Sequence, residues 1–161
     1  MERAGRIARL AIITAFGAGY APKAPGTCGS LVALVLVALL PDGVWYFWCA
    51  SGAAVAASLG CVALGGFAER HFRRKDPEPF VLDEVAGMLV AALSLTKPPL
   101  HWCAAAFALF RWLDIKKPFG IARLQRFKGG IGIAADDLAA GALALAIVQG
   151  SRFLVSVGGG A

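Results

Sequence analysis

Charged residues are scarce in this chain, and acidic residues are the scarcer of the two kinds. Only 16% of its 161 residues are charged, with 16 Lys and Arg against 10 Asp and Glu, whereas soluble domains are about 25% charged. Hydrophobic residues make up 58%, and the mean hydropathy is +0.69. These figures exclude disorder and collagen-like structure and do not fit an ordinary water-soluble domain. The net charge of +6 therefore indicates an anionic membrane surface or lipid as partner, and no nucleic acid.

Several catalytic motifs are also missing. The four cysteines form no Cys-x-x-Cys pair, so a zinc or redox site is not expected, and no Cys is followed six positions later by Arg. There is no Asp-x-Asp pair and no Walker-type glycine loop. Of the two histidines, His101 is expected on the far side of the membrane from His71, which excludes a two-histidine phosphatase mechanism.

Five apolar stretches, residues 27–40, 44–67, 85–95, 100–113 and 138–148, are separated by Pro, Gly and charged residues, and the last could continue to residue 157. Only the second has the ~20 residues of a simple membrane span, so the others are expected to be short or re-entrant. The sequence predicts an all-α integral membrane bundle of about four to five short transmembrane or re-entrant helices. It forms one domain, residues 1–161, with a helical core over residues 17–150.

The N-terminal segment carries Arg3, Arg6 and Arg9 before a short apolar run, residues 10–16. A signal peptide has a similar pattern. We favour an uncleaved amphipathic helix over residues 1–16 that lies on the inner membrane face.

The charged residues are distributed unequally between the two sides of the membrane. If the N-terminus is cytoplasmic and all five stretches cross, 14 of the 16 basic residues lie on the inner side. This distribution predicts a multi-pass membrane protein whose basic segments face the cytoplasm. Nine of the ten acidic residues fall on the same side, which the positive-inside rule does not require, so we expect the active site to face the cytoplasm.

Three acidic groups mark the ends of apolar stretches: Asp83-Glu84, Asp114 and Asp136-Asp137. Capping of helix starts is one explanation for such residues. The second explanation is that all three acidic groups converge at one depth in the membrane. A divalent cation would then relieve the repulsion between their carboxylates. Hard oxygen ligands suit Mg²⁺. Gly87 follows Asp83 and Gly141 follows Asp137 by one helical turn, which would let the two backbones approach. The candidate catalytic residues are Asp83, Glu84, Asp114, Asp136 and Asp137, and the candidate metal ligands are Asp83, Glu84, Asp136 and Asp137.

Candidate phosphate-binding groups surround these acids. The segment Pro25-Gly26-Thr27-Cys28-Gly29-Ser30 begins an apolar helix and offers free N–H groups and hydroxyls, although a simple capped helix start has the same pattern. Arg111 is one helical turn before Asp114, where it could also pair with a carboxylate or snorkel. Residues 128–132 are interpreted as a flexible loop. The predicted phosphate-binding residues are Lys23, Thr27, Ser30, Arg111 and Lys116.

Four ordered motifs resemble those of the phosphatidylglycerophosphatase A family. They are residues 17–19 with 22–30, Asp76-Pro77 with 81–88, residues 110–119, and residues 129–133 with Asp136, Asp137 and Gly141. Two departures, Ala134 in place of a usual methionine and Gly120 in place of a frequent second proline, remove no polar group.

The resemblance implies a Mg²⁺-dependent membrane phosphatase that hydrolyses phosphatidylglycerophosphate to phosphatidylglycerol and inorganic phosphate, with no obligate protein partner evident. Asp114 would be a further ligand or the general base. Attack by a metal-activated water and attack by a carboxylate both stay open. The alternatives are a phosphatase for another membrane lipid phosphate, or a non-enzymatic ion or lipid transporter subunit.

Overall fold

The computed structural model describes residues 2–118 and 130–158, and within these two ranges all regular structure is helical. The elements are α1 (Glu2–Ile13), the short 3-10 helix η1 (Ala18–Tyr20), α2 (Pro25–Leu39), α3 (Val44–Phe72), α4 (Leu82–Ala91), α5 (Leu100–Lys116) and α6 (Gly130–Gly158). The predicted all-α bundle is confirmed.

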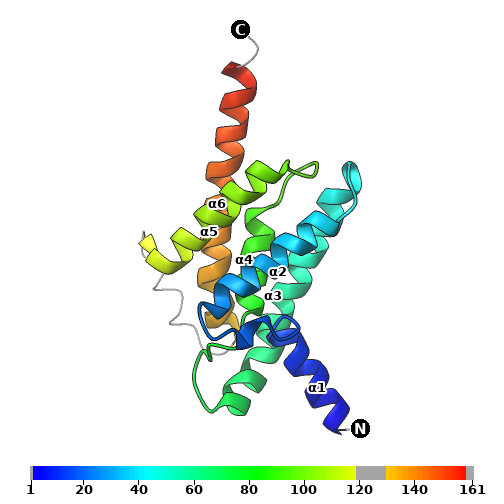
Figure 1. Ribbon diagram of the computed structural model, residues 1–161, viewed down its shortest axis with the longest axis vertical. Coiled ribbons are helices and arrows are strands. Elements are labelled where there is room, and N and C mark those ends of the chain that lie inside the picture. Colours follow the sequence, from blue (N-terminus) through cyan, green and yellow to red (C-terminus); the bar gives the residue numbers. More distant parts are fainter. Residues whose placement is uncertain (1, 119–129, 159–161) are drawn as a thin grey trace.

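Helix α4 is the centre of the bundle. It contacts α2, α3, α5 and α6, and eight of its ten residues are buried. From α2 to α6, successive helices run in alternating directions, so that α4 and α6 run the same way (Figure 1). The starts of α4 and α6 therefore lie toward the same end of the molecule.

Helices α3 and α6 are the longest, at 29 residues each. At ~1.5 Å per residue each extends about 43 Å, enough to cross a hydrocarbon core of ~30 Å. Both are apolar enough to be candidate spans, and only 17% of the most apolar window of α3 is buried. The core helix of a soluble protein would be mostly buried, so the exposed apolar surface of α3 favours contact with lipid. Both helices extend beyond the apolar stretches 44–67 and 138–148 that predicted them.

The connection between α4 and α5 is irregular, and side chains from other helices bond its backbone. The hydroxyl of Tyr46 donates to the carbonyl of Ala92 at 2.8 Å, and Gln149 Nε2 donates to the carbonyl of Leu93 at 2.6 Å. In the opposite direction, Lys97 of the connection itself donates through Nζ to the carbonyls of Ala38 and Leu40 at the end of α2, at 2.7 and 2.8 Å. These bonds satisfy backbone carbonyls that have no partner within a helix.

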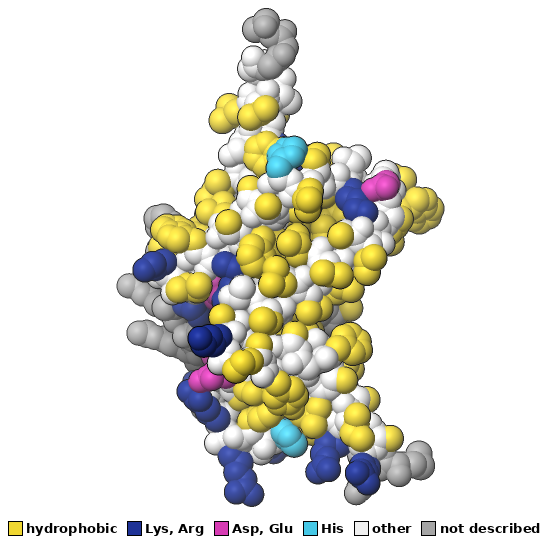
Figure 2. All heavy atoms as spheres, in the orientation of Figure 1, with side chains coloured by type: hydrophobic (Ala, Val, Ile, Leu, Met, Phe, Trp, Pro, Cys, Tyr) yellow, Lys and Arg dark blue, Asp and Glu magenta, His cyan; other side chains and the backbone are white. Residues whose placement is uncertain are grey.

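Helix α1 projects from the end of the bundle where α3 ends and α4 begins (Figure 1). Its arginines are exposed, while Ile13 is buried against the bundle. Figure 2 shows Lys and Arg side chains gathered around this end and its flank. An ion pair of Lys97 with Asp42, 3.5 Å apart, lies among the loops at the opposite end. The basic residues Arg123, Arg126 and Lys128 belong to the predicted inner side and lie outside the described residues.

Candidate active site

Two glycines bring α4 and α6 into backbone contact close to the acidic residues. A Cβ built on Gly141 would lie 2.3 Å from the carbonyl oxygen of Gly87, and one built on Gly87 would lie 2.7 Å from the carbonyl oxygen of Asp137. No side chain fits at that separation. The predicted approach of the two helices, one turn from Asp83 and Asp137, is therefore present in the structure.

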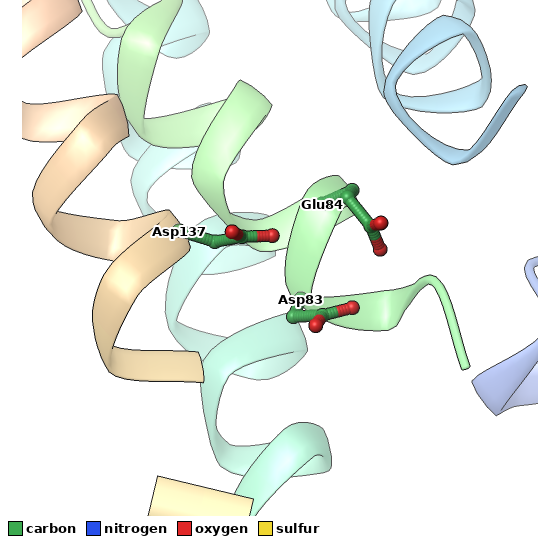
Figure 3. Close-up of side chains that lie close together, drawn as sticks. All are labelled: Asp83, Glu84 and Asp137. Atoms are coloured by element: carbon green, nitrogen blue, oxygen red, sulfur yellow. The ribbon is translucent and has the colours of Figure 1, made fainter. Parts of the chain in front are cut away.

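Asp83, Glu84 and Asp137 form a compact carboxylate cluster between α4 and α6 (Figure 3). One oxygen of each lies within 4.8 Å of the others, and Asp83 and Asp137 are only 7% and 4% exposed. In the described part of the chain, the buried atoms Asp83 Oδ1 and Glu84 Oε2 have no hydrogen-bond partner. Unpartnered buried carboxylates are costly unless a cation or a proton neutralises them.

These three residues fit a magnesium site. Mg²⁺ binds oxygen at about 2.1 Å, so two oxygens on one ion are at most about 4.2 Å apart. The carboxylate oxygens of the three residues lie within 4.8 Å of one another, so only small side-chain adjustments would bring them onto one ion. Helix capping explains the cluster less well. Asp137 is the eighth residue of α6 rather than part of its first turn. Asp83 does lie in the first turn of α4, but that helix has no side-chain capping hydrogen bond.

The other two predicted acids each face a cation. Asp136 Oδ2 accepts a hydrogen bond from Lys117 Nζ, and Asp114 Oδ2 accepts one from Arg111 Nη1 at 2.6 Å. The structure thus brings three of the four predicted metal ligands together and pairs the fourth, Asp136, with Lys117. The roles of all five acids stay predictions.

One cavity of about 190 Å³ joins these groups. Seven of the ten acidic residues of the chain line it, together with Lys117. Asp76, Glu78 and Lys117 were not among the predicted site residues, although the Asp76-Pro77 motif was a signal for the first of them. The carboxylates on the wall are Asp76, Glu78, Asp83, Glu84, Asp114, Asp136 and Asp137.

Two of the lining groups outside the helices, Asp76 and Lys117, have shifted pKa values. Desolvation raises the pKa of Asp76, and the neighbouring charge of Asp136 raises it further, although the residue is exposed to solvent on one side. Burial lowers the pKa of the Lys117 ammonium, but the hydrogen bond and charge of Asp136 outweigh burial, so the pKa is raised overall. Lys117 is therefore a cation at neutral pH, held against an acidic wall.

The predicted phosphate-binding residues are more scattered, and none of the five is among the residues lining this cavity. Lys23 and Lys116 are exposed and Thr27 is partly buried. The buried hydroxyl of Ser30 donates to the carbonyl of Gly26 at 2.9 Å. Arg111 reaches the cavity only through its pair with Asp114.

The start of α2 does reach the site, through its backbone. A Cβ built on Gly26 would lie 2.1 Å from Glu84 Oε1 and 3.3 Å from Arg111 Nη2, and Pro25 lines the cavity. The first N–H groups of a helix can bind anions, but Pro25 has none, and Thr27 and Cys28 donate theirs to the carbonyl of Ala24 at 3.0 and 3.2 Å. The N–H of Gly26 is therefore the backbone donor that α2 can offer to a ligand. Backbone groups of α2, rather than the hydroxyls of Thr27 and Ser30, are thus closest to the carboxylates.

Comparison with known proteins identifies the family. The family described as Phosphatidylglycerophosphatase A matches residues 11–152. The chain belongs to this family. Its relatives include proteins named "Phosphatidylglycerophosphatase A" from Escherichia coli, 32% identical over 138 residues (83% of this chain, 77% of the relative), and from Haemophilus influenzae, 35% identical over 136 residues (83% and 82%). A third, from Bacteroides thetaiotaomicron, is named "Putative phosphatidylinositol-3-phosphatase" and is 34% identical over 151 residues (88% and 92%). No solved structure matches the chain.

Membership of this family makes the chain a phosphatase and confirms the resemblance seen in its motifs. The non-enzymatic transporter alternative is thereby excluded. Each of the four phosphatidylglycerophosphatase A motifs contributes at least one residue to the wall of the 190 Å³ cavity: Pro25, Asp83, Asp114 and Asp137 come from the four in order.

Proposed function

We propose that this phosphatase is Mg²⁺-dependent and hydrolyses phosphatidylglycerophosphate to phosphatidylglycerol and inorganic phosphate. The observation that carries the proposal is the buried cluster of Asp83, Glu84 and Asp137, two of whose oxygens have no partner among the described residues. A cavity so rich in carboxylates repels a phosphate unless cations are present, and Mg²⁺ is the cation that an all-oxygen site favours.

Asp83, Glu84 and Asp137 would hold the metal, with Asp136 as a further candidate. Bound Mg²⁺ would withdraw charge from the phosphate and make a bound water a better nucleophile at neutral pH. Lys117 lines the cavity and would add a positive charge for the phosphate oxygens, which makes it a better candidate than the exposed Lys116. The N–H of Gly26, at the start of α2, would add one backbone donor to the anion site.

Asp114 also lines this cavity, so we propose that it accepts a proton from the attacking water. In that route the oxygen of water replaces the glycerol oxygen on phosphorus, and phosphatidylglycerol leaves as the alcohol. In the alternative route a carboxylate attacks phosphorus first and forms an acyl-phosphate. Trapping a phosphorylated enzyme in a single turnover would support the second route, and its absence under rapid quenching would support the first.

The location that we propose is the bacterial inner membrane, with the cavity on the cytoplasmic side. Two helices are long and apolar enough to cross, and 14 of the 16 basic residues fall on one side if the five apolar stretches cross in turn. Basic loops stay preferentially in the cytoplasm. The polar groups of the site would then lie at the level of the inner-leaflet headgroups, where a phosphorylated lipid presents its phosphate.

The substrate is the part of the proposal that most needs a direct test, because the relative from Bacteroides thetaiotaomicron carries the name of an inositol-lipid phosphatase. Phosphate release should be measured with phosphatidylglycerophosphate, phosphatidylinositol-3-phosphate and a phosphorylated isoprenoid at equal surface concentrations. We expect phosphatidylglycerophosphate to have the highest kcat/KM. A higher value for either competitor would replace the proposed substrate and leave the phosphatase assignment intact.

The role of the cluster is tested by three substitutions of one type. Asp83→Asn and Asp137→Asn remove ligand charge and are expected to abolish Mg²⁺-stimulated phosphate release. Asp42→Asn is the matched control, because Asp42 is an exposed aspartate paired with Lys97 away from the cavity. Equal activity in all four proteins would refute the proposed site.

A further inference from the structure

A second cavity of about 340 Å³ lies between α1, α2, α3 and α4. Every residue that lines it is Ala, Gly, Val, Leu, Ile or Phe. Its volume is within the ~300–1,000 Å³ typical of small-molecule sites. We name this cavity the apolar groove; it is bounded mainly by Val32, Leu36, Ala56, Gly60, Leu82 and Leu89.

The apolar groove and the carboxylate cavity share α4. Leu82, Val85 and Leu89 face the groove, whereas Asp83 and Glu84 line the carboxylate cavity. A helix turns once in 3.6 residues, so positions 82, 85 and 89 lie on one side and 83, 84 and 87 on the other. Between Leu82 and Leu89 the groove wall extends about 10 Å along α4, away from the acidic end. The two cavities have no lining residue in common, but the groove begins at Leu82, one residue before Asp83, and runs away from the acidic end of the same helix.

Small residues on α3 keep the groove hollow. Ala53, Ala56, Ala57 and Gly60 have the spacing of one helix face, and all four line the groove. Such faces allow another helix to pack closely; α3 does contact α4, and the small residues also border the groove beside that contact. A Cβ built on Gly60 would lie 2.9 Å from Leu82 Cδ2, so even a methyl group there would narrow the groove.

The rim of the groove is exposed. Ile12, Phe16 and Leu36 line it and are 46%, 87% and 41% exposed. Phe16 lies three residues beyond the end of α1 and is the last residue of the segment 1–16 that we place at the membrane surface, so the rim is at the expected depth of the headgroup boundary. An acyl chain could therefore enter sideways from the surrounding lipid.

We propose that the apolar groove binds one acyl chain of the lipid substrate while the phosphate occupies the carboxylate cavity on the other side of α4. This inference rests on the proposed function, because it requires a substrate that has both parts. It predicts that the enzyme recognises the chain as well as the headgroup.

The kinetic test uses a substitution that fills the groove with a large side chain. Ala56→Trp places an indole in it, and Ala63→Trp is the control, because Ala63 is an exposed residue of α3 that does not line the groove. Each variant is assayed with long-chain phosphatidylglycerophosphate and with its deacylated, water-soluble counterpart. We expect Ala56→Trp to raise KM for the long-chain substrate about tenfold, the loss expected when roughly two methylene groups are no longer buried. KM for the deacylated substrate should stay unchanged, as should both values in Ala63→Trp.

Equal effects of Ala56→Trp on both substrates, or no effect on either, would overturn the proposal. Failure of the wild-type protein to hydrolyse either substrate would instead refute the proposed function.

A binding experiment tests the groove without catalysis. Phosphatidylglycerol with a photoreactive group in one acyl chain is irradiated with the wild-type protein in vesicles. Labelling of α3 and α4 at the groove, reduced in Ala56→Trp and not in Ala63→Trp, is expected. Labelling spread evenly over the lipid-exposed surface, or a change of oligomeric state in Ala56→Trp that shows a second copy seated there, would contradict it.

Discussion

A substitution at the contact between Gly87 and Gly141 would test the site without changing any charged group. In Gly141→Ala the new Cβ would lie 2.3 Å from the carbonyl oxygen of Gly87, whereas ordinary contact begins at 3.4 Å. The obstacle is backbone, so α4 and α6 must separate by about 1 Å. A displacement of ~1 Å in a catalytic site costs about 100-fold in rate. Overpacking of this kind typically costs about 1–3 kcal/mol in stability.

The matched control is Gly150→Ala on the same helix. A Cβ there meets nothing within 4 Å, and alanine is favoured over glycine in a helix by about 1 kcal/mol. We therefore expect Gly150→Ala to retain activity and unfold at a slightly higher temperature, while Gly141→Ala loses about 100-fold in kcat and unfolds at a lower one. Activity of Gly141→Ala within twofold of wild type would refute the claim that this contact sets the separation of the carboxylates.

Three further predictions concern single side chains. Lys117→Ala should lower kcat/KM at least tenfold, because it removes a charged hydrogen bond at the cavity, whereas Lys116→Ala should stay within twofold. Tyr46→Phe should cost about 1 kcal/mol and lower the unfolding temperature, because the carbonyl of Ala92 loses its donor. Desolvation holds the pKa of Asp76 above its usual value, so its ionised form opposes folding above about pH 4. Asp76→Asn should therefore raise the unfolding temperature at pH 7 in a chelator, and this gain should vanish below about pH 4.

The sequence predicted the helices and the residues at their polar ends, since both depend on local patterns. The apolar stretches located the five helices that follow α1. The pairs Asp83 with Gly87 and Asp137 with Gly141 indicated which two helices meet, because a one-turn spacing is visible in sequence.

Helix boundaries and side-chain directions were harder to predict. The glycines at 130 and 132 indicated a loop, yet α6 begins at Gly130. A Cβ on Gly130 would lie 2.1 Å from the carbonyl oxygen of Cys61, so this glycine serves close packing against α3, which only the tertiary structure reveals.

The end of α5 shows a second limit. The sequence predicts Lys116 as one of five phosphate-binding residues, but Lys117 is the lysine that lines the cavity. Lys117 has a left-handed backbone with φ of 44°, which ends the helix and changes the direction of the chain. Helical periodicity does not apply beyond that point, so the sequence could not distinguish two adjacent lysines.

The most direct test of the account is a measurement of metal binding at the carboxylate cluster. Mn²⁺ can replace Mg²⁺ at oxygen sites and is followed by its paramagnetic resonance signal as it is titrated into the purified protein in detergent. We expect saturable binding that Mg²⁺ displaces, that is lost in Asp83→Asn and Asp137→Asn, and that is retained in Asp42→Asn. Mn²⁺ affinity that is the same in all four proteins would contradict the claim that these carboxylates hold the catalytic metal.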